Sequence, residues 1–262
     1  MTKSLVDVVI PAKNQSQLVL RCIQSLRAQK RIGDIILIDD GSQDSDRDIF
    51  KTIPNVNLYR NSGSEGFIKS TSRGVNKSNA PYVLLLNSDT EAYHTDCLKV
   101  MAENLDDGAK ICGALLLYPK NDLYRPERIQ HAAIYYGSDG FPNHIFGGWH
   151  AATPAANVKR IVPAVTGACF MIKRDWWEKL NGWDNKLGRG VFEDVEACIR
   201  TIKMGGEIVY EPKSVFTHYE HASQEPGSNW FTRENIQKNF QYLTLKHGIQ
   251  PPSDSYWFKG IA

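Results

Sequence analysis

No apolar run in this 262-residue chain approaches the roughly 18 residues of a membrane-spanning helix, and its first ten residues lack the pattern of a secretion signal. The five cysteines lie far apart and form no CxxC pair, which argues against zinc or redox sites and favours core thiols in a reducing compartment. Positive and negative charges nearly balance, since the chain has 31 lysines and arginines and 29 aspartates and glutamates. We therefore expect a soluble, cytoplasmic protein that does not bind nucleic acid.

Glycine-rich nucleotide-binding loops are also missing. The turn after the first predicted strand reads PAKNQS (residues 11–16) and contains no glycine, so the GxGxxG fingerprint of dinucleotide-binding proteins is absent. The phosphate loop GxxxxGK[ST] is absent as well, and so is the glycine-rich turn with a basic residue that sugar nucleotidylyltransferases carry. Dinucleotide binding, a phosphate-loop enzyme and a nucleotidyltransferase are all disfavoured.

Apolar runs alternate with stretches of helical periodicity. Strands are predicted near residues 4–10, 34–39, 56–59, 81–87 and 111–118, with helices near 19–26, 44–51, 66–77 and 95–105. This alternation predicts an α/β fold with a mostly parallel sheet covered by helices on both faces. Residues 119–160 are rich in Gly, Pro, Asn and aromatics, which predicts long loops with a small antiparallel piece. Further on, a strand is expected near 161–165, a helix containing Trp176 and Trp177 with at least one of them buried, and an amphipathic helix over 235–247.

Acidic residues follow two of the predicted strands. Asp39 and Asp40 end the second strand, and Asp89 follows the strand at 81–87. Ligands of open parallel sheets lie across the carboxyl ends of the strands, so these acids should face one crevice. The alternative is that they are turn residues, or caps for the next helix.

The segment FEDVEACIR (192–200) predicts a helix with one buried stripe at spacings of 4, 3 and 4, formed by Val191, Val195, Cys198 and Ile202. Glu193 and Asp194 fall in its first turn, off that stripe, and could face a cleft. Acids in a first turn are also favoured by the helix dipole, so a purely structural role is the alternative. Glu196 and Arg200, four residues apart, predict a surface ion pair.

Seven features, taken in order, resemble the motifs of the inverting family 2 glycosyltransferases, and most closely their rhamnosyltransferase-like branch. They are VVIPAKN (8–14), IDDGS (38–42), LLLNSDT (84–90), TGACFMIKR (166–174), NGWD (181–184), FEDVEACIR (192–200) and His218. The resemblance extends from about residue 5 to about residue 223. It implies a GT-A fold, which is Rossmann-like, with a small acceptor-side subdomain. It also implies a UDP- or dTDP-sugar donor, a divalent cation, and direct displacement at the anomeric carbon.

The resemblance assigns the donor and metal sites. Donor contacts are implied for Pro11, Ala12, Lys13, Asp39, Asp40, Asn61, Gly66 and Ser88, with the two aspartates at the base and ribose. Asp89 matches the last acid of the family's DXD motif, whereas Asn87 replaces the first. His218 is implied as a second metal ligand, with His221 as a weaker alternative. An imidazole ligand favours Mn²⁺ over Mg²⁺.

The resemblance also assigns the catalytic and acceptor sites. Asp194 matches the family's base, which takes the proton of the acceptor hydroxyl, and Glu193 is expected to orient the acceptor or the loop. Thr166, Gly167, Trp183 and Asp184 are implied to lie near the donor sugar or the acceptor. Aromatic residues within 135–150 are expected to form either an acceptor wall or the core of a subdomain.

The expected organisation is a glycosyltransferase domain over residues 1–223, followed by a helix and tail over 224–262 that pack on it. Its first half, 1–118, binds the nucleotide sugar, and 119–223 hold the acceptor and the catalytic acids. The tail segment Tyr256, Trp257 and Phe258 is expected to dock on the body, a partner subunit or a membrane surface. The oligomeric state is left open. The predicted function is a metal-dependent glycosyltransferase acting on a glycan or lipid-linked glycan in surface polysaccharide synthesis, at or near the inner membrane face. A non-catalytic nucleotide-sugar or glycan-binding protein is the alternative.

Overall fold

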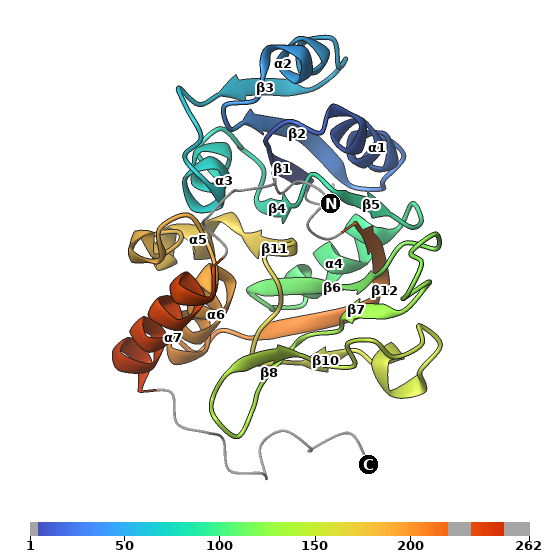
Figure 1. Cartoon of the computed structure of the whole chain (residues 1–262). Coiled ribbons are helices and arrows are strands. Elements are labelled where there is room, and N and C mark those ends of the chain that lie inside the picture. Colours follow the sequence, from blue (N-terminus) through green and yellow to red (C-terminus); the bar gives the residue numbers. More distant parts are fainter. Residues whose placement is uncertain (1–4, 220–231, 249–262) are drawn as a thin grey trace.

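A large central sheet organises the computed structural model, which describes residues 5–219 and 232–248 (Figure 1). In spatial order its main strands are β10 (Arg160–Ile161), β12 (Ile208–His218), β6 (Ile111–Leu117), β11 (Cys169–Lys173), β4 (Tyr82–Leu86), β1 (Val6–Ala12), β2 (Ile32–Asp39) and β3 (Asn57–Arg60). Two short strands join its rim, β5 (Thr90–Ala92) beside β12 and β7 (Ile129–His131) beside β6. A separate antiparallel pair is formed by β8 (Ile134–Tyr136) and β9 (Pro142–His144).

Most strands of the main sheet point the same way. β1 pairs in parallel with β2 and β4, β2 with β3, and β6 with β12. β11 runs antiparallel between β4 and β6, so it joins the two parallel blocks into one sheet. The predicted α/β fold with a mostly parallel sheet is confirmed, and so is the small antiparallel piece after residue 119.

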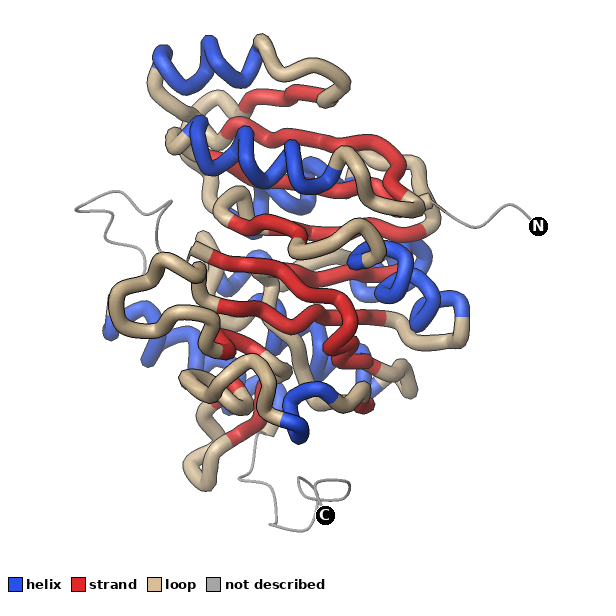
Figure 2. Tube along the Cα trace, turned by 90° about the vertical axis from the view of Figure 1, so that its right-hand side faces the viewer, coloured by secondary structure: helices blue, strands red, loops and turns tan. Residues whose placement is uncertain are grey.

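Helices cover both faces of the sheet, as Figure 2 shows. One face carries α1 (Ser16–Leu26), α2 (Asp44–Lys51) and α4 (Cys97–Asp106), and the other carries α3 (Phe67–Val75), α5 (Arg174–Leu180), α6 (Glu193–Lys203) and α7 (Arg233–His247). Two short 3₁₀ turns, η1 (Pro154–Asn157) and η2 (Asn185–Leu187), lie in the connections. Successive residues of a strand point to opposite faces of the sheet. In β1, Val8 and Ile10 belong to the buried cluster on the side of α1, whereas Val9 belongs to the cluster on the side of α3. This two-sided burial explains the near-continuous apolar strands of the sequence.

The expected strand at 161–165 is wrong in its extent. β10 ends at Ile161, and the chain then runs as an irregular segment to Cys169. Pro163 cannot donate a hydrogen bond to a neighbouring strand, and the next residue, Ala164, makes only an isolated bridge to Ile134. This irregular segment brings Thr166 and Gly167 to the end of the sheet.

The expected ion pair of Glu196 and Arg200 forms at 2.6 Å, but its expected place on the surface is wrong. Glu196 is fully buried, because α7 packs against α6 and brings Lys246 to 2.7 Å and His247 to 3.1 Å from its Oε1 atom (Figure 1). Arg200 completes the network with a 2.7 Å hydrogen bond to the other carboxylate oxygen. The predicted apolar stripe of α6 is shorter than expected, since Ile202 at its end is 45% exposed.

Other local predictions are confirmed. All five cysteines are buried and free, and both Trp176 and Trp177 are buried. The helix expected over 235–247 is α7, and its Leu243 belongs to the same buried cluster as the sheet face it covers. Within residues 5–219 and 232–248, none of the helices combines the length and apolar character needed to cross a bilayer. His221 and the segment Tyr256 to Phe258 lie outside the described residues.

Candidate active site

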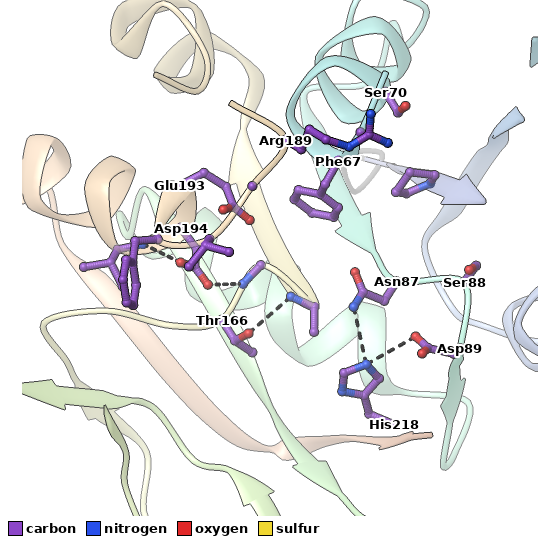
Figure 3. Close-up of a pocket in the computed structure, with 18 of the residues that line it drawn as sticks. Phe67, Ser70, Asn87, Ser88, Asp89, Thr166, Arg189, Glu193, Asp194 and His218 are labelled. Atoms are coloured by element: carbon purple, nitrogen blue, oxygen red, sulfur yellow. Dashed lines mark hydrogen bonds and ion pairs between the residues drawn. The ribbon is translucent and has the colours of Figure 1, made fainter. Parts of the chain in front are cut away.

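A cavity of about 570 Å³ opens at the carboxyl ends of the parallel strands. Its walls come from segments far apart in the sequence: residues 11–13 after β1, Asp40 after β2, 87–89 after β4, 166–168 before β11, 189–195 at the start of α6, and His218 at the end of β12. Figure 3 shows Glu193 and Asp194 on one side of this cavity and Asn87, Asp89 and His218 on another. The crevice expected from the positions of the acids therefore exists, and it includes the acid pair of α6.

Asp40 organises the wall next to β2. Its carboxylate accepts hydrogen bonds from Asn61 Nδ2 at 2.7 Å and from the backbone N–H groups of Glu65 and Gly66 at 2.7 and 3.0 Å. Burial alone would raise the pKa of Asp40, but these hydrogen bonds lower it below its ordinary value. Asp40 is thus ionised, and it fastens the 61–66 loop at the cavity edge. Asn61 is buried behind this wall and is not among the lining residues, whereas Gly66 lines the cavity.

Asp39 has a different place from its neighbour. It is fully buried, it is not among the residues that line the cavity, and its carboxylate is held by Arg60 and by the backbone N–H of Ser42 at 2.8 Å. Adjacent residues at a strand end point to opposite faces, so only one of the two acids faces the opening. Asp39 therefore has a structural role at the β2–β3 edge, and its expected nucleotide contact stays a prediction.

Asp89 and His218 meet at the end of the sheet where β5 pairs with β12. The Asp89 Oδ1 and His218 Nε2 atoms lie 3.2 Å apart, and both residues are buried at the cavity wall (Figure 3). Because an amide oxygen can only accept, His218 Nδ1–H donates to Gln130 Oε1 at 2.5 Å, which leaves Nε2 facing Asp89 and the cavity. Asn87 Nδ2 lies 3.3 Å from the same nitrogen.

These residues fit a divalent cation. A carboxylate oxygen of Asp89 and an imidazole nitrogen of His218 lie 3.2 Å apart at the cavity wall. The other ring nitrogen of His218 is oriented by the amide oxygen of Gln130, as hydrogen-bond acceptors commonly orient metal-binding histidines. Mixed oxygen and nitrogen donors suit Mn²⁺ better than Mg²⁺. Across residues 5–219 and 232–248, no cluster of three or more His, Cys, Asp or Glu forms a complete cage. The remaining positions would thus be filled by water and by the ligand.

Glu193 and Asp194 begin α6 at the opposite wall. The Asp194 carboxylate accepts hydrogen bonds of 2.7 Å from the backbone N–H groups of Gly167 and Val195. Burial raises the pKa of Asp194, while these hydrogen bonds act in the opposite direction. Burial, followed by the charge of Asp194, raises the pKa of Glu193 to about 8. At neutral pH the two acids therefore differ, with Asp194 the more readily ionised and Glu193 mostly protonated.

The remaining predicted site residues divide between the cavity and the core. Pro11, Ala12, Lys13, Ser88, Thr166 and Gly167 line the cavity. Trp183 does not, because it is buried among other aromatics and its Nε1–H donates to Thr71 Oγ1 at 2.8 Å. Asp184 does not either, since it pairs with Lys246 at 2.6 Å and accepts from the Tyr242 hydroxyl at 2.6 Å. Trp183 and Asp184 thus have structural roles in the NGWD turn, and their expected donor-sugar or acceptor contacts stay predictions.

Several lining residues were missed by sequence reasoning. Gln130 lies on β7, inside a region predicted as loops, and no local signal marks it. Arg189 stands between two glycines shortly before the acid pair, a signal that could have been noticed. It connects the segment before α6 to the 61–66 loop on the other side of the cavity, since its guanidinium donates to the Ser64 carbonyl and hydroxyl oxygens at 2.8 and 2.6 Å. Within 135–150, Phe146 packs against the core as the subdomain reading expects, whereas Phe141 lines the cavity and its role as an acceptor wall stays a prediction.

Comparisons with known proteins agree with this architecture. The chain is 25% identical over 251 residues to the uncharacterized protein y4gI of Sinorhizobium fredii, covering 91% of this chain and 27% of y4gI. It is 25% identical to the O-antigen biosynthesis protein RfbC of Myxococcus xanthus, across 96% of this chain and 20% of RfbC. The chain thus spans only a fraction of the length of these curated relatives.

The crystal structure of GalNAc-T7 with UDP, GalNAc and Mn²⁺ is similar to this structure with a TM-score of 0.72 at 18% identity, covering 92% of this chain and 48% of that one. This likeness confirms the GT-A fold. The sequence itself matches Glycosyl transferase family 2 over residues 7–180, which is well over half of the chain. The chain belongs to glycosyl transferase family 2.

Proposed function

We propose that this protein is a metal-dependent inverting glycosyltransferase, which moves a sugar from a nucleotide-diphosphate sugar to a hydroxyl of a glycan acceptor. One observation carries the proposal. A single cavity joins the strand-end segments that would hold the nucleotide, the Asp89–His218 pair that suits a cation, and the acid pair of α6. A donor with its diphosphate near Asp89 would then lie with its sugar toward Glu193 and Asp194.

The donor end combines polar and cationic groups. Residues 11–13 and Asp40 flank the place for the base and ribose, and Lys13 and Arg189 line the same cavity. A cation held by Asp89 and His218 would neutralise the charge that builds up on the diphosphate as the glycosidic bond breaks. The UDP and Mn²⁺ in the GalNAc-T7 structure support the same choice of ligand and metal for this chain.

The acid pair supplies the base. Asp194, oriented by the N–H groups of Gly167 and Val195, takes the proton of the acceptor hydroxyl. The acceptor oxygen then forms a bond to the anomeric carbon while the bond from that carbon to the diphosphate oxygen breaks. Asp194 and the metal pair face the cavity from different sides, which suits attack opposite the leaving group and hence inversion. Protonated Glu193 can donate a hydrogen bond that orients the acceptor.

We infer the chemical class of the donor from the family resemblance, and that of the acceptor from the similar proteins. A hexosyl or deoxyhexosyl unit carried by UDP or dTDP is proposed as the donor. The relative involved in O-antigen biosynthesis favours a surface polysaccharide as the product, made on a glycan or lipid-linked glycan. Such an acceptor places the enzyme on the cytoplasmic side of a membrane, with peripheral association.

A donor screen by mass spectrometry tests the proposal. The protein is incubated with UDP-, dTDP- and GDP-sugars, in Mn²⁺ and in chelator, with and without glycan acceptors. Metal-dependent transfer or slow donor hydrolysis supports the proposed activity. Binding without turnover supports a non-catalytic sugar-nucleotide or glycan-binding protein, and nucleotidyl transfer from a nucleoside triphosphate refutes both.

Asp194→Asn separates catalysis from binding. The variant should keep its donor affinity but lose roughly 100-fold or more of its turnover, because the amide cannot accept the proton. Asp107→Asn, at an exposed position after α4, is the matched control and should behave as the wild type. Substantial residual turnover in Asp194→Asn would remove Asp194 from the mechanism.

A further inference from the structure

The backbone that presents the acid pair is strained. Val191 and Phe192, directly before Glu193 and Asp194, have φ angles of 74° and 69°. Left-handed backbone is unfavourable for any residue with a Cβ atom and especially for a β-branched one. Two such residues in succession are energetically unfavourable and persist only where surrounding contacts hold them.

Asn239 of α7 supplies such contacts. Its Nδ2 group lies within hydrogen-bond distance of three backbone carbonyl oxygens, those of Leu187 at 3.2 Å, Gly190 at 3.0 Å and Val191 at 3.1 Å. Its side chain is buried, with 8% of the residue exposed. Buried carbonyl groups without a donor are costly, so the amide stabilises the turn in the observed conformation.

The same face of α7 forms part of the cavity wall. Ile236, one turn before Asn239, lines the cavity. Phe240, the next residue after Asn239, packs against Phe141 at 5.1 Å and Phe192 at 6.4 Å between ring centroids. Residues spaced three and four apart share one face of a helix, so a single face of α7 contacts both the turn and the cavity. This helix lies beyond residues 7–180, over which the family match extends.

We propose that Asn239 is a positioning residue, which holds the 187–192 turn so that Glu193 and Asp194 face the cavity at the correct angle. The effect of Asn239 on catalysis rests on the proposed function, whereas its effect on the conformation of the turn does not. Without the amide, the strained turn relaxes and the carboxylates move. A displacement of about 1 Å in a catalytic group is enough to cost roughly 100-fold in rate.

The test compares Asn239→Ala and Asn239→Asp with the wild type. Alanine removes the donor, and aspartate has nearly the same shape but places an acceptor against three carbonyl oxygens. Gln241→Glu is the matched control, because it makes the same amide-to-carboxylate change at an exposed position of the same helix. Hydrogen–deuterium exchange of the peptide spanning residues 187–196 reports on the turn. Steady-state turnover of the active donor and calorimetric binding of UDP with Mn²⁺ report on the site.

Both Asn239 variants should exchange about tenfold faster in residues 187–196 while exchange in the sheet stays unchanged. Their kcat should fall roughly 10- to 100-fold. Their UDP affinity should fall by no more than about tenfold, because Arg189 lies in the turn while the other residues proposed to contact the nucleotide lie on other elements. Unchanged exchange and unchanged kcat in both variants would overturn the proposal. Loss of UDP affinity together with faster exchange throughout the chain would also overturn it, since that marks general destabilisation. If the wild type turns over no donor, the proposed function fails, and local exchange alone then decides the role of Asn239.

Discussion

Glu193 offers a test of the site that needs no substrate. Its carboxyl is buried with 8% of the residue exposed, and within the described part of the chain its Oε2 atom has no hydrogen-bond partner. Burial and then the charge of Asp194 raise the pKa of Glu193 from 4.5 to about 8. Replacing it by glutamine keeps the shape of the protonated acid but removes its ionisation.

The sign of the effect follows from which state binds the proton. Between about pH 5 and about pH 7.5 the unfolded chain has lost the Glu193 proton while the folded protein retains it, so rising pH favours unfolding. Each pH unit in this window lowers the free energy of unfolding by about 1.4 kcal/mol. The stability advantage of Glu193→Gln over the wild type should therefore grow by about 3 kcal/mol across the window.

Urea unfolding followed by tryptophan fluorescence measures this difference at each pH, since the chain has six tryptophans. Glu207→Gln, at an exposed position between α6 and β12, is the matched control and should show no such pH dependence relative to the wild type. A stability difference between Glu193→Gln and the wild type that stays constant or shrinks from about pH 5 to about pH 7.5 would refute the reasoning. It would mean that Glu193 ionises normally and that the two acids do not divide their roles by protonation.

Three further predictions concern other parts of the molecule. Gln130→Leu removes the acceptor that orients His218 and should weaken Mn²⁺ binding about 10- to 100-fold by calorimetry, and unchanged affinity would argue against a metal site here. Lys246→Met leaves buried Glu196 with fewer partners and should lower the free energy of unfolding by about 2 kcal/mol in urea, so an unchanged midpoint would contradict the buried network. Arg189→Gln removes a cation from the cavity and should weaken UDP binding about tenfold, whereas equal affinity would place the diphosphate elsewhere.

Most of the structure before residue 119 could be predicted because its signals are local. The strands β1, β2 and β4 are largely apolar, and each is followed by polar residues at the edge where a parallel sheet binds its ligands. The positions of Asp40 and Asp89 at the cavity follow from that rule alone. The role of Asp39 does not, because it depends on Arg60, whose place is set by the neighbouring strand.

The structure after residue 119 is harder to derive from local pattern. The stripe of α6 correctly leaves the acid pair free to face a cleft, but the same periodicity suggests that Glu196 and Arg200 form a surface pair. Only the packing of α7, which begins some 40 residues after the acid pair, buries Glu196. Asp184 takes part in the same contact, because its carboxylate pairs with Lys246 at 2.6 Å.

The sequence by itself determined the α/β architecture, the family resemblance and the acids at the strand ends, because these depend on residues close together in the chain. Tertiary structure decided which of these acids share one cavity, that Gln130 orients His218, and that Asn239 supports the turn before Glu193 and Asp194. Those contacts join residues about 50 to 90 positions apart, with separations of 88 for the Gln130–His218 pair and 49 for Asn239 with Gly190. No periodicity or motif encodes such pairs, since they arise only when the sheet and the helices that cover it pack together.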